Sequence, residues 1–493
     1  MCRKSAVALR ESALRGTAAR LARRARRDVI IGIMLLALWV MFHAAAGSQT
    51  PSRPKALSAH DYEQLAQQSA AERDWPEAID EFRRAIEVAP KNPKLRNELA
   101  AALVASHDFT GAIAAYQDVL RLEPRDEPAE LGMAACYRQV HNYDEARNLL
   151  VRAGAEHPGT AAPFLALGNL DIELQRYDDA IESLQRAVHI APANNDARND
   201  LAAAFHAKGQ LPEALAQLEV VLSRDPKNTL AHYLRAEIYA DQNDTAHGLP
   251  EAQTVVDEQP GTPRGRILLG KILIRVPDCA RAVEVLKPLE SAQPPDPETL
   301  FLLQRAFLCA GDAPSAQRVT AEFEAASKGD RATKENVTQA GHLVEQANDR
   351  ALHNDLPGAL DLLKQALDKD PNNGSAYSQL AKLYYSAGDI EKADEAARKA
   401  LAIRPSHPDY LYVYGKILER EGKLDDALHT FEQVTLVNPK EADAYFEIGA
   451  IRQHQGDTKQ ARAAFQKAVD LVPDDPDYRR ALEAVSAGGS GTR

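Results

Sequence analysis

The feature of this sequence that most restricts its fold is a period of 34 residues. Prolines recur at this spacing in two series: Pro90, Pro124, Pro158, Pro192, Pro226, Pro260 and Pro294, and then Pro371, Pro405, Pro439 and Pro473. Twelve residues before each proline stands a small residue: Ala78, Ala112, Ala146, Ala180, Ala214, Gly248 and Ala282, and then Ala359, Ala393, Ala427 and Ala461. The unit between the two series has Ala316 at the small position and Lys328 in place of proline. Twelve units result, from about residue 59 to residue 475, and such a period is typical of stacked repeats.

We expect each unit to form two antiparallel helices, A and B. In the fourth unit, residues recur at spacings of three and four from Phe164 to Asp171 and again from Ala180 to Val188, which is the spacing of one helix face. A Gly-Asp or similar turn joins the helices, as at Gly388-Asp389 and Gly456-Asp457. Proline ends helix B, because it lacks the N–H that would continue the hydrogen-bond ladder. One hairpin cannot bury its apolar face alone, so neighbouring units should stack into one core.

The eighth position of helix A is small in many units. The residues there include Gly168, Gly270, Gly415, Gly449, Ala134 and Ala381. A small residue lets two helix backbones approach closely, and we expect the alanine of helix B to receive this contact.

The last units show a further pattern. Unit 11 carries Leu411, Tyr414-Gly415, Ala427, Phe431 and Pro439, and unit 12 carries Tyr445, Ile448-Gly449, Ala461, Phe465, Ala468 and Pro473. On these residues the chain resembles the tetratricopeptide repeat family, and the resemblance covers about 417 of the 493 residues. It implies an all-α fold, a right-handed α-solenoid of helix-turn-helix repeats.

Two units depart from the pattern. In unit 6, Leu249–Ala252 resembles a helix start displaced by four residues, which predicts a lengthened turn through Asp241–Gly248 and a shortened helix B. Unit 8 lacks its proline and is followed by nine extra residues, 331–339. These form either a hinge or a simple helix extension.

The predicted organisation follows from these boundaries. Units 1–8 occupy residues 59–330 and units 9–12 occupy residues 340–475, on either side of the 331–339 insertion. Residues 476–493 supply a short capping helix, from Tyr478 to Val485, and a flexible Gly-Ser tail.

The N-terminal part differs in charge from the repeats. Residues 1–28 form a basic head with nine Lys/Arg side chains against Glu11 and Asp28. Residues 29–46 are apolar and would span about 27 Å as a helix, which predicts a transmembrane segment or signal anchor, and residues 47–58 form a linker. The positive-inside rule then predicts a single-pass protein of the inner (cytoplasmic) membrane, with a cytoplasmic N-terminus and periplasmic repeats.

Two alternatives to this anchor stay open. Cleavage near Ala46, after three consecutive alanines, would release a soluble exported protein. A head rich in Arg, Ala and Ser is also typical of a mitochondrial address, which would place the chain in a mitochondrial membrane.

The remaining composition excludes several classes of function. The net charge is −12, and the residues after 28 carry −19, so nucleic acid is not expected as a partner. None of the fourteen histidines forms a His-Glu-x-x-His pattern, and no phosphate-binding loop or nucleophile elbow is present. We therefore expect no enzyme activity, cofactor or metal. Cys279 and Cys309 fall in adjacent units and are either bridged or two separate thiols.

The family resemblance implies that helix A lines a concave groove, mainly with its second, fifth, ninth, twelfth and thirteenth residues. Two groups of candidate partner-binding residues follow. Units 7 and 8 present Arg264, Lys271, Arg275 and Arg305, and units 10 and 11 present Ser378, Lys382, Tyr385, Tyr412, Lys416 and Arg420. Alternatively, these cations only solvate helix faces and pair with Glu237, Asp241, Glu298 or Glu419.

The sequence thus predicts a non-catalytic, membrane-anchored scaffold that binds proteins or peptides in its groove, for assembly of an envelope or secretion complex. The alternatives are a soluble exported binding protein and an accessory subunit of a sugar- or lipid-handling enzyme. The sequence predicts neither the partner nor the oligomeric state.

Overall fold

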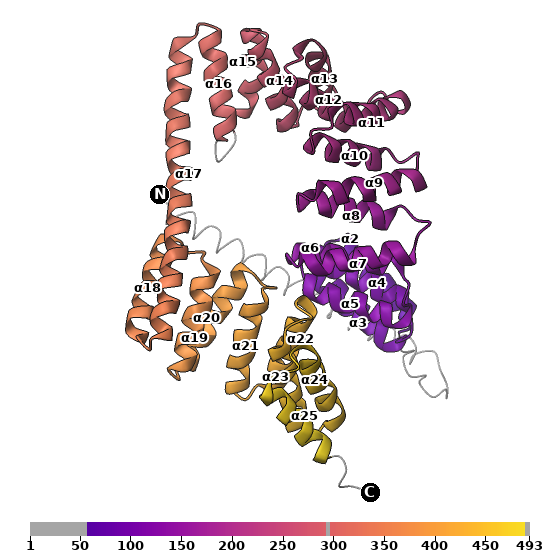
Figure 1. The fold of residues 1–493 in the computed structure, drawn as a ribbon, viewed down its shortest axis with the longest axis vertical. Helices are drawn as coiled ribbons and strands as arrows, with labels where there is room; N and C mark the ends of the chain where they lie inside the picture. Colours follow the sequence, from indigo (N-terminus) through magenta and orange to yellow (C-terminus); the bar gives the residue numbers. More distant parts are fainter. Residues whose placement is uncertain (1–56, 292–295, 489–493) are drawn as a thin grey trace, which may run out of the picture. The chain divides into compact units, whose positions relative to one another are not determined.

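The computed structural model describes residues 57–291 and 296–488, and these residues form helices and no strand (Figure 1). The helices belong to one unit that begins at Ala59. They are α2 (Ala59–Ala71), α3 (Trp75–Val88), α4 (Pro93–Ala105), α5 (Phe109–Leu122), α6 (Glu127–Gln139), α7 (Tyr143–Glu156), α8 (Ala162–Glu173), α9 (Tyr177–Ile190), α10 (Asn195–Ala207), α11 (Leu211–Arg224), α12 (Thr229–Asp241), α13 (Thr245–Glu258), α14 (Pro263–Arg275), α15 (Cys279–Leu286), the 3-10 helix η1 (Lys287–Leu289), α16 (Pro297–Cys309), α17 (Ala313–Leu352), α18 (Leu356–Lys369), α19 (Gly374–Ser386), α20 (Ile390–Ile403), α21 (Pro408–Arg420), α22 (Leu424–Val437), α23 (Ala442–His454), α24 (Thr458–Leu471) and α25 (Pro476–Gly488).

Each predicted unit is a helical hairpin, and consecutive hairpins pack on one another. The turns show why the helices begin where they do. Gly388 and Gly456 both have a φ of +81°, a conformation that glycine adopts without strain. The next residue caps the following helix: the Asp457 carboxylate accepts a hydrogen bond from the Gln460 backbone N–H at 3.0 Å. The predicted all-α solenoid of hairpins is therefore confirmed.

The small residues of helix B lie in the core, as predicted. The alanines at this position, from Ala78 to Ala461, are almost completely buried. The glycine of helix A makes a different contact from the one predicted: a Cβ built on Gly449 would lie 2.6 Å from the Phe465 ring. Gly449 thus leaves room for the Phe465 ring of helix B, which stands four residues after Ala461, the small residue of helix B in this unit.

The prediction for unit 6 is wrong. Helix α13 begins at Thr245 and has 14 residues, like helix B in most other units, with Pro250 inside it. Its start is fixed by Asp244, whose carboxylate accepts a hydrogen bond from the His247 N–H at 3.2 Å, and by burial of Gly248. The cap and the core contact hold the helix in register although Pro250 removes one hydrogen bond.

The residues between units 8 and 9 are helical. Helix α17 runs without interruption for 40 residues, so residues 331–339 lie inside it (Figure 1). It serves as helix B of unit 8 and helix A of unit 9. The structure therefore has the helix extension, one of the two interpretations of this insertion.

The capping helix is longer than predicted. Helix α25 spans Pro476–Gly488, and its Tyr478 and Val485 side chains are buried, 7% and 4% exposed. Tyr478 packs with Ala442, and Val485 packs with Phe465, so this helix covers the apolar face of the last hairpin.

The predicted single-pass location in the inner membrane is wrong for the residues that the structure describes. Among residues 57–291 and 296–488, no helix has the length and hydropathy needed to cross a membrane. The head, the predicted span at residues 29–46 and most of the linker lie outside the described residues.

Candidate functional site

Two helix A segments in the middle of the chain carry the first group of predicted residues. Arg264, Lys271 and Arg275 lie on α14, and Arg305 lies on α16. We call these four residues the basic strip. Helix α14 begins with Pro263, which suits the first turn of a helix, and it contains four cations and no carboxylate. Helices α14 and α16 contact each other, so the four residues lie on adjoining helices.

The four cations of the strip differ in their partners. Lys271 Nζ lies 2.5 Å from Glu298 Oε1, and Glu298 is one of the four acidic partners that the sequence suggested for these cations. The Arg275 guanidinium donates a hydrogen bond to the Ala240 carbonyl. Arg264 and Arg305 are exposed, and neither forms an ion pair with any residue that the structure describes. Two charges of the strip are thus available to a partner.

A disulfide fixes the end of α16 beside unit 7. Cys279, the first residue of α15, is bonded to Cys309, the last residue of α16, with the Cα atoms 5.5 Å apart. This separation lies within the usual range for a disulfide. Of the two interpretations open from the sequence, the structure has the bridge.

Most residues of the second predicted group, in units 10 and 11, are buried or contact other residues of the same chain. We call these six residues the mixed patch. Ser378 is 3% exposed, so it offers no surface to a partner. Lys382 is exposed, and Tyr385 is half-buried beneath the Arg420 guanidinium, 5.6 Å from the ring centre.

Lys416 and Tyr412 converge on a buried carboxylate of the next unit. Lys416 Nζ lies 2.6 Å from Glu419 and 3.0 Å from Glu447, and the Tyr412 hydroxyl donates to Glu447 at 3.3 Å. Burial raises the pKa of Glu447 and of Tyr412. Burial opposes the charge on Lys416, but its hydrogen bonds to Glu419 and Glu447 raise the lysine pKa above the ordinary value. This network joins α21 to α23.

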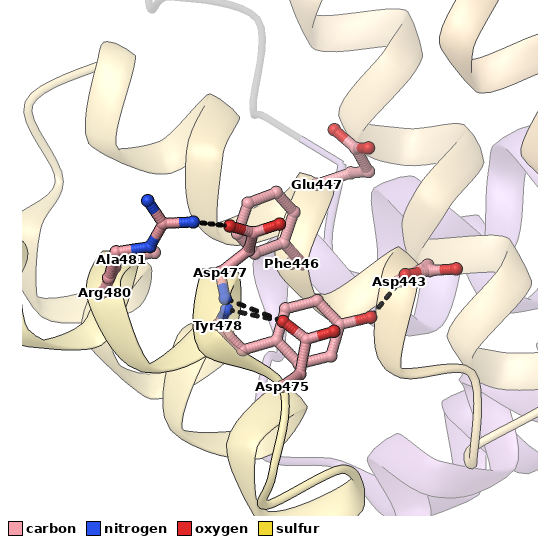
Figure 2. Close-up of a pocket in the computed structure, with 8 residues that line it drawn as sticks. All are labelled: Asp443, Phe446, Glu447, Asp475, Asp477, Tyr478, Arg480 and Ala481. Carbon is pink, nitrogen blue, oxygen red and sulfur yellow. Dashed lines mark hydrogen bonds and ion pairs between the residues drawn. The ribbon is translucent and has the colours of Figure 1, made fainter.

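A pocket that sequence reasoning missed lies beside this network, between α23 and α25 (Figure 2). Its volume is about 530 Å³, and it is lined by Asp443, Phe446, Glu447, Asp475, Asp477, Tyr478, Arg480 and Ala481. The signal was present in the 34-residue period: Asp443 and Asp477 are 34 residues apart and occupy the second position of α23 and of the capping helix α25.

The carboxylates of this pocket already have partners. Figure 2 shows the Tyr478 hydroxyl donating to Asp443 and the Arg480 guanidinium pairing with Asp477. Asp475 caps α25 by accepting from the Asp477 and Tyr478 backbone N–H groups at 2.8 and 3.1 Å. These contacts make the pocket a helix junction.

A second pocket, of about 390 Å³, lies on helix α4 and the turn before α6. It is lined by Pro93, Lys94, Asn97, Glu98, Ala101, Glu123 and Asp126. In the described part of the chain, no group of three or more His, Cys, Asp or Glu side chains is arranged to hold a metal ion.

Three family models match the chain. The model described as the tetratricopeptide-repeat domain of cytochrome c-type biogenesis protein H matches residues 330–480. One general tetratricopeptide-repeat model matches residues 103–170 and again 171–238, and another matches residues 64–127.

Curated relatives match shorter segments. The chain is 27% identical over 100 residues to small glutamine-rich tetratricopeptide repeat-containing protein 2 of Mycosarcoma maydis, covering 20% of this chain and 28% of that protein. It is 23% identical over 177 residues to human DnaJ homolog subfamily C member 7, covering 34% of this chain and 36% of that protein. The matches thus span about a third or less of the length of these relatives.

Solved structures of repeat proteins also match. A tetratricopeptide repeat protein from Parabacteroides merdae aligns with a TM-score of 0.42 and 19% identity, covering 50% of this chain and 98% of that chain. YrrB, described as a tetratricopeptide-repeat protein with an unusual peptide-binding site, aligns with a TM-score of 0.32 and 26% identity, covering 37% of this chain and 95% of that chain. On the matches of the family models, residues 64–238 and 330–480 carry tetratricopeptide repeats, and the repeat predicted from the 34-residue period is confirmed.

Proposed function

We propose that the protein is a non-catalytic scaffold that holds an acidic segment of a partner protein on the basic strip of units 7 and 8. The observation that carries the proposal is the exposure of Arg264 and Arg305 without an ion pair among the described residues, on two neighbouring A helices. The residues after 28 carry a net charge of −19. Free cations that interrupt an acidic surface favour an acidic partner and steer its approach.

The process in which the scaffold acts is proposed from the family description. The model that matches residues 330–480 is named for cytochrome c-type biogenesis, which is the maturation of another protein. We propose that this chain likewise assists the assembly or maturation of envelope proteins, with units 9–12 and the basic strip both serving as binding surfaces.

The test is crosslinking capture with the full chain in its native host. The variant Arg264→Glu/Arg305→Glu reverses both free charges of the strip, and we expect it to lose the captured partner. The matched control, Arg462→Glu/Lys467→Glu, reverses two exposed cations of α24, a B helix, and should capture the same proteins as the wild type. An unchanged set of captured proteins for the strip variant contradicts the proposal.

A further inference from the structure

The basic strip is accompanied by exposed apolar side chains. Phe301 and Leu308 lie on α16, on either side of Arg305, and are 43% and 59% exposed. Their separation of seven residues places them on one helix face, about 10 Å apart along the axis. Large apolar side chains that stay exposed on one face are typical of an interaction surface.

The neighbouring unit repeats this arrangement. Ile267 and Ile274 stand on α14 at the same helix positions as Phe301 and Leu308 on α16. Both isoleucines are half-buried and pack against the core of these units. The apolar residues of both helices flank a cation at the ninth position, Lys271 or Arg305 in the respective helix.

The Phe301 side chain and the backbone at Leu308 are held in place before any partner binds. The Phe301 ring lies 5.9 Å from the Phe323 ring, centre to centre, and the Arg305 guanidinium lies 5.8 Å from the Phe301 ring centre. Leu308 directly precedes Cys309, which the disulfide joins to α15. A side chain that is already ordered loses little conformational freedom on binding, which suits Phe301 to anchor a partner.

We infer that α14 and α16 together form a docking surface for an acidic segment of another protein that carries two large apolar side chains about 10 Å apart. The apolar pair would contact Phe301 and Leu308, and the flanking carboxylates would pair with Arg264 and Arg305. Charge selects the occupant: α14 carries four cations and no carboxylate, and Glu298 neutralises only Lys271. This inference rests on the proposed function and adds the chemistry of the bound segment.

The test measures binding of two fluorescein-labelled synthetic peptides to the full chain. In the helical peptide, two leucines stand seven residues apart, and in the extended peptide, which is held in the polyproline II conformation, they stand three residues apart. Each spacing places both leucines on one face, about 10 Å apart. Glutamates occupy the flanking positions. We expect one of the two to bind, and its counterpart with lysine in place of glutamate, or with the leucines replaced by alanine, to bind at least about tenfold more weakly.

Protein variants separate the apolar contribution from the charges. Phe301→Ala/Leu308→Ala should weaken binding about tenfold while the circular dichroism spectrum stays unchanged, because both side chains are exposed. The matched control Val88→Ala/Leu122→Ala removes two apolar side chains that are 54% and 40% exposed in units 1 and 2, and should bind like the wild type.

The possible outcomes distinguish this inference from the proposed function. If neither peptide binds, or if Phe301→Ala/Leu308→Ala binds like the wild type, the inference is overturned. The proposed function still stands if Arg264→Glu/Arg305→Glu abolishes capture in the host. Self-association of the wild type that Phe301→Ala/Leu308→Ala removes, measured by sedimentation, would make a second copy the occupant and also overturn the inference.

Discussion

The basic strip and the mixed patch both carry cations at the ninth and thirteenth helix positions, but these cations have different surroundings. In the patch, Lys416 spans two units and neutralises the buried carboxylate of Glu447. In the strip, Arg264 and Arg305 point to solvent, and the end of α16 is joined to unit 7 by the Cys279–Cys309 bridge. Arg264 and Arg305 are thus without an ion pair among the described residues, whereas Lys271 pairs with Glu298 of the next unit as Lys416 pairs with Glu447.

We propose that the patch contributes to stability and the strip to binding. Each assignment can be tested, because a change in one region should leave the other unaffected. The largest expected effect concerns the bond that holds the strip in place.

Removal of the disulfide should loosen the strip region alone. The bridge closes a loop with a sequence separation of 30 residues, and a loop of this size corresponds to about 3.6 kcal/mol of stabilisation. We expect Cys279→Ala/Cys309→Ala to lower the thermal midpoint and to speed amide hydrogen exchange in α14–α16. Exchange in α21–α23 should be unchanged.

Reducing agent provides the control for this variant. It should reproduce the effect in the wild type and have none on Cys279→Ala/Cys309→Ala. If hydrogen exchange became equally faster in both regions, the disulfide would stabilise the patch as well as the strip, and the proposed difference between the two regions would be wrong.

Loss of a cation should destabilise the patch much more than the strip. Lys416→Met leaves Glu447 buried without its ammonium partner, which we expect to lower the free energy of unfolding by about 2 kcal/mol. Arg305→Met removes an exposed charge without an ion-pair partner and should change it by less than about 0.5 kcal/mol. Urea unfolding followed by circular dichroism measures both.

A double-mutant cycle sharpens this contrast. Glu447→Gln should recover part of the stability that Lys416→Met loses, because the buried charge has been removed. No recovery would mean that Lys416 acts through packing of its stem and not through the ion pair.

The difference between the two regions shows where sequence reasoning stops. The 34-residue period predicts each hairpin, because it reflects contacts within a unit, such as those of Gly449 with Phe465. The sequence also offered Glu298 and Glu419 as possible partners of the cations, and they pair with Lys271 and Lys416. It did not predict the contact of Lys416 with Glu447, 31 residues later, because that contact depends on how two A helices pack.

Local sequence patterns gave a wrong prediction where a contact elsewhere in the unit determined the helix boundary. Leu249–Ala252 resembles a helix start, but the Asp244 cap and the buried Gly248 already fix α13. In unit 7, Pro288 replaces the last turn of helix B with η1, a shortening that the period alone does not reveal. The residues of the strip were predicted from their positions in helix A. The exposure of Phe301 and Leu308 could not be predicted in this way, because it depends on which neighbouring side chains pack into the core.

The pH dependence of stability should distinguish the patch from the strip. Burial raises the pKa of Glu447, although Lys416 opposes this shift. The folded carboxyl therefore keeps its proton at a pH where the unfolded one has lost it, and stability falls as the pH rises from the ordinary glutamate value of 4.5 through the raised value. Glu447→Gln cannot titrate, so the wild type should lose thermal stability relative to this variant over that interval.

Arg305→Met is the control for this titration, since an arginine keeps its charge throughout the interval. Its thermal midpoint should follow that of the wild type at each pH. Parallel curves for the wild type and Glu447→Gln would mean that Glu447 titrates alike in the folded and unfolded chains.

The smallest effect on stability is expected from charge reversal in the strip. Arg264→Glu/Arg305→Glu should change the free energy of unfolding by about 0.5 kcal/mol or less per site, yet it should remove the bound partner. Partner binding by the wild type should also weaken as salt is raised, because exposed charges are screened. If this variant binds no partner but unfolds like the wild type, the substitutions have removed the binding surface and left the fold intact. If the same variant instead unfolded as readily as Lys416→Met, the strip would be part of the structural network, and the division between a binding region and a stabilising region would be wrong.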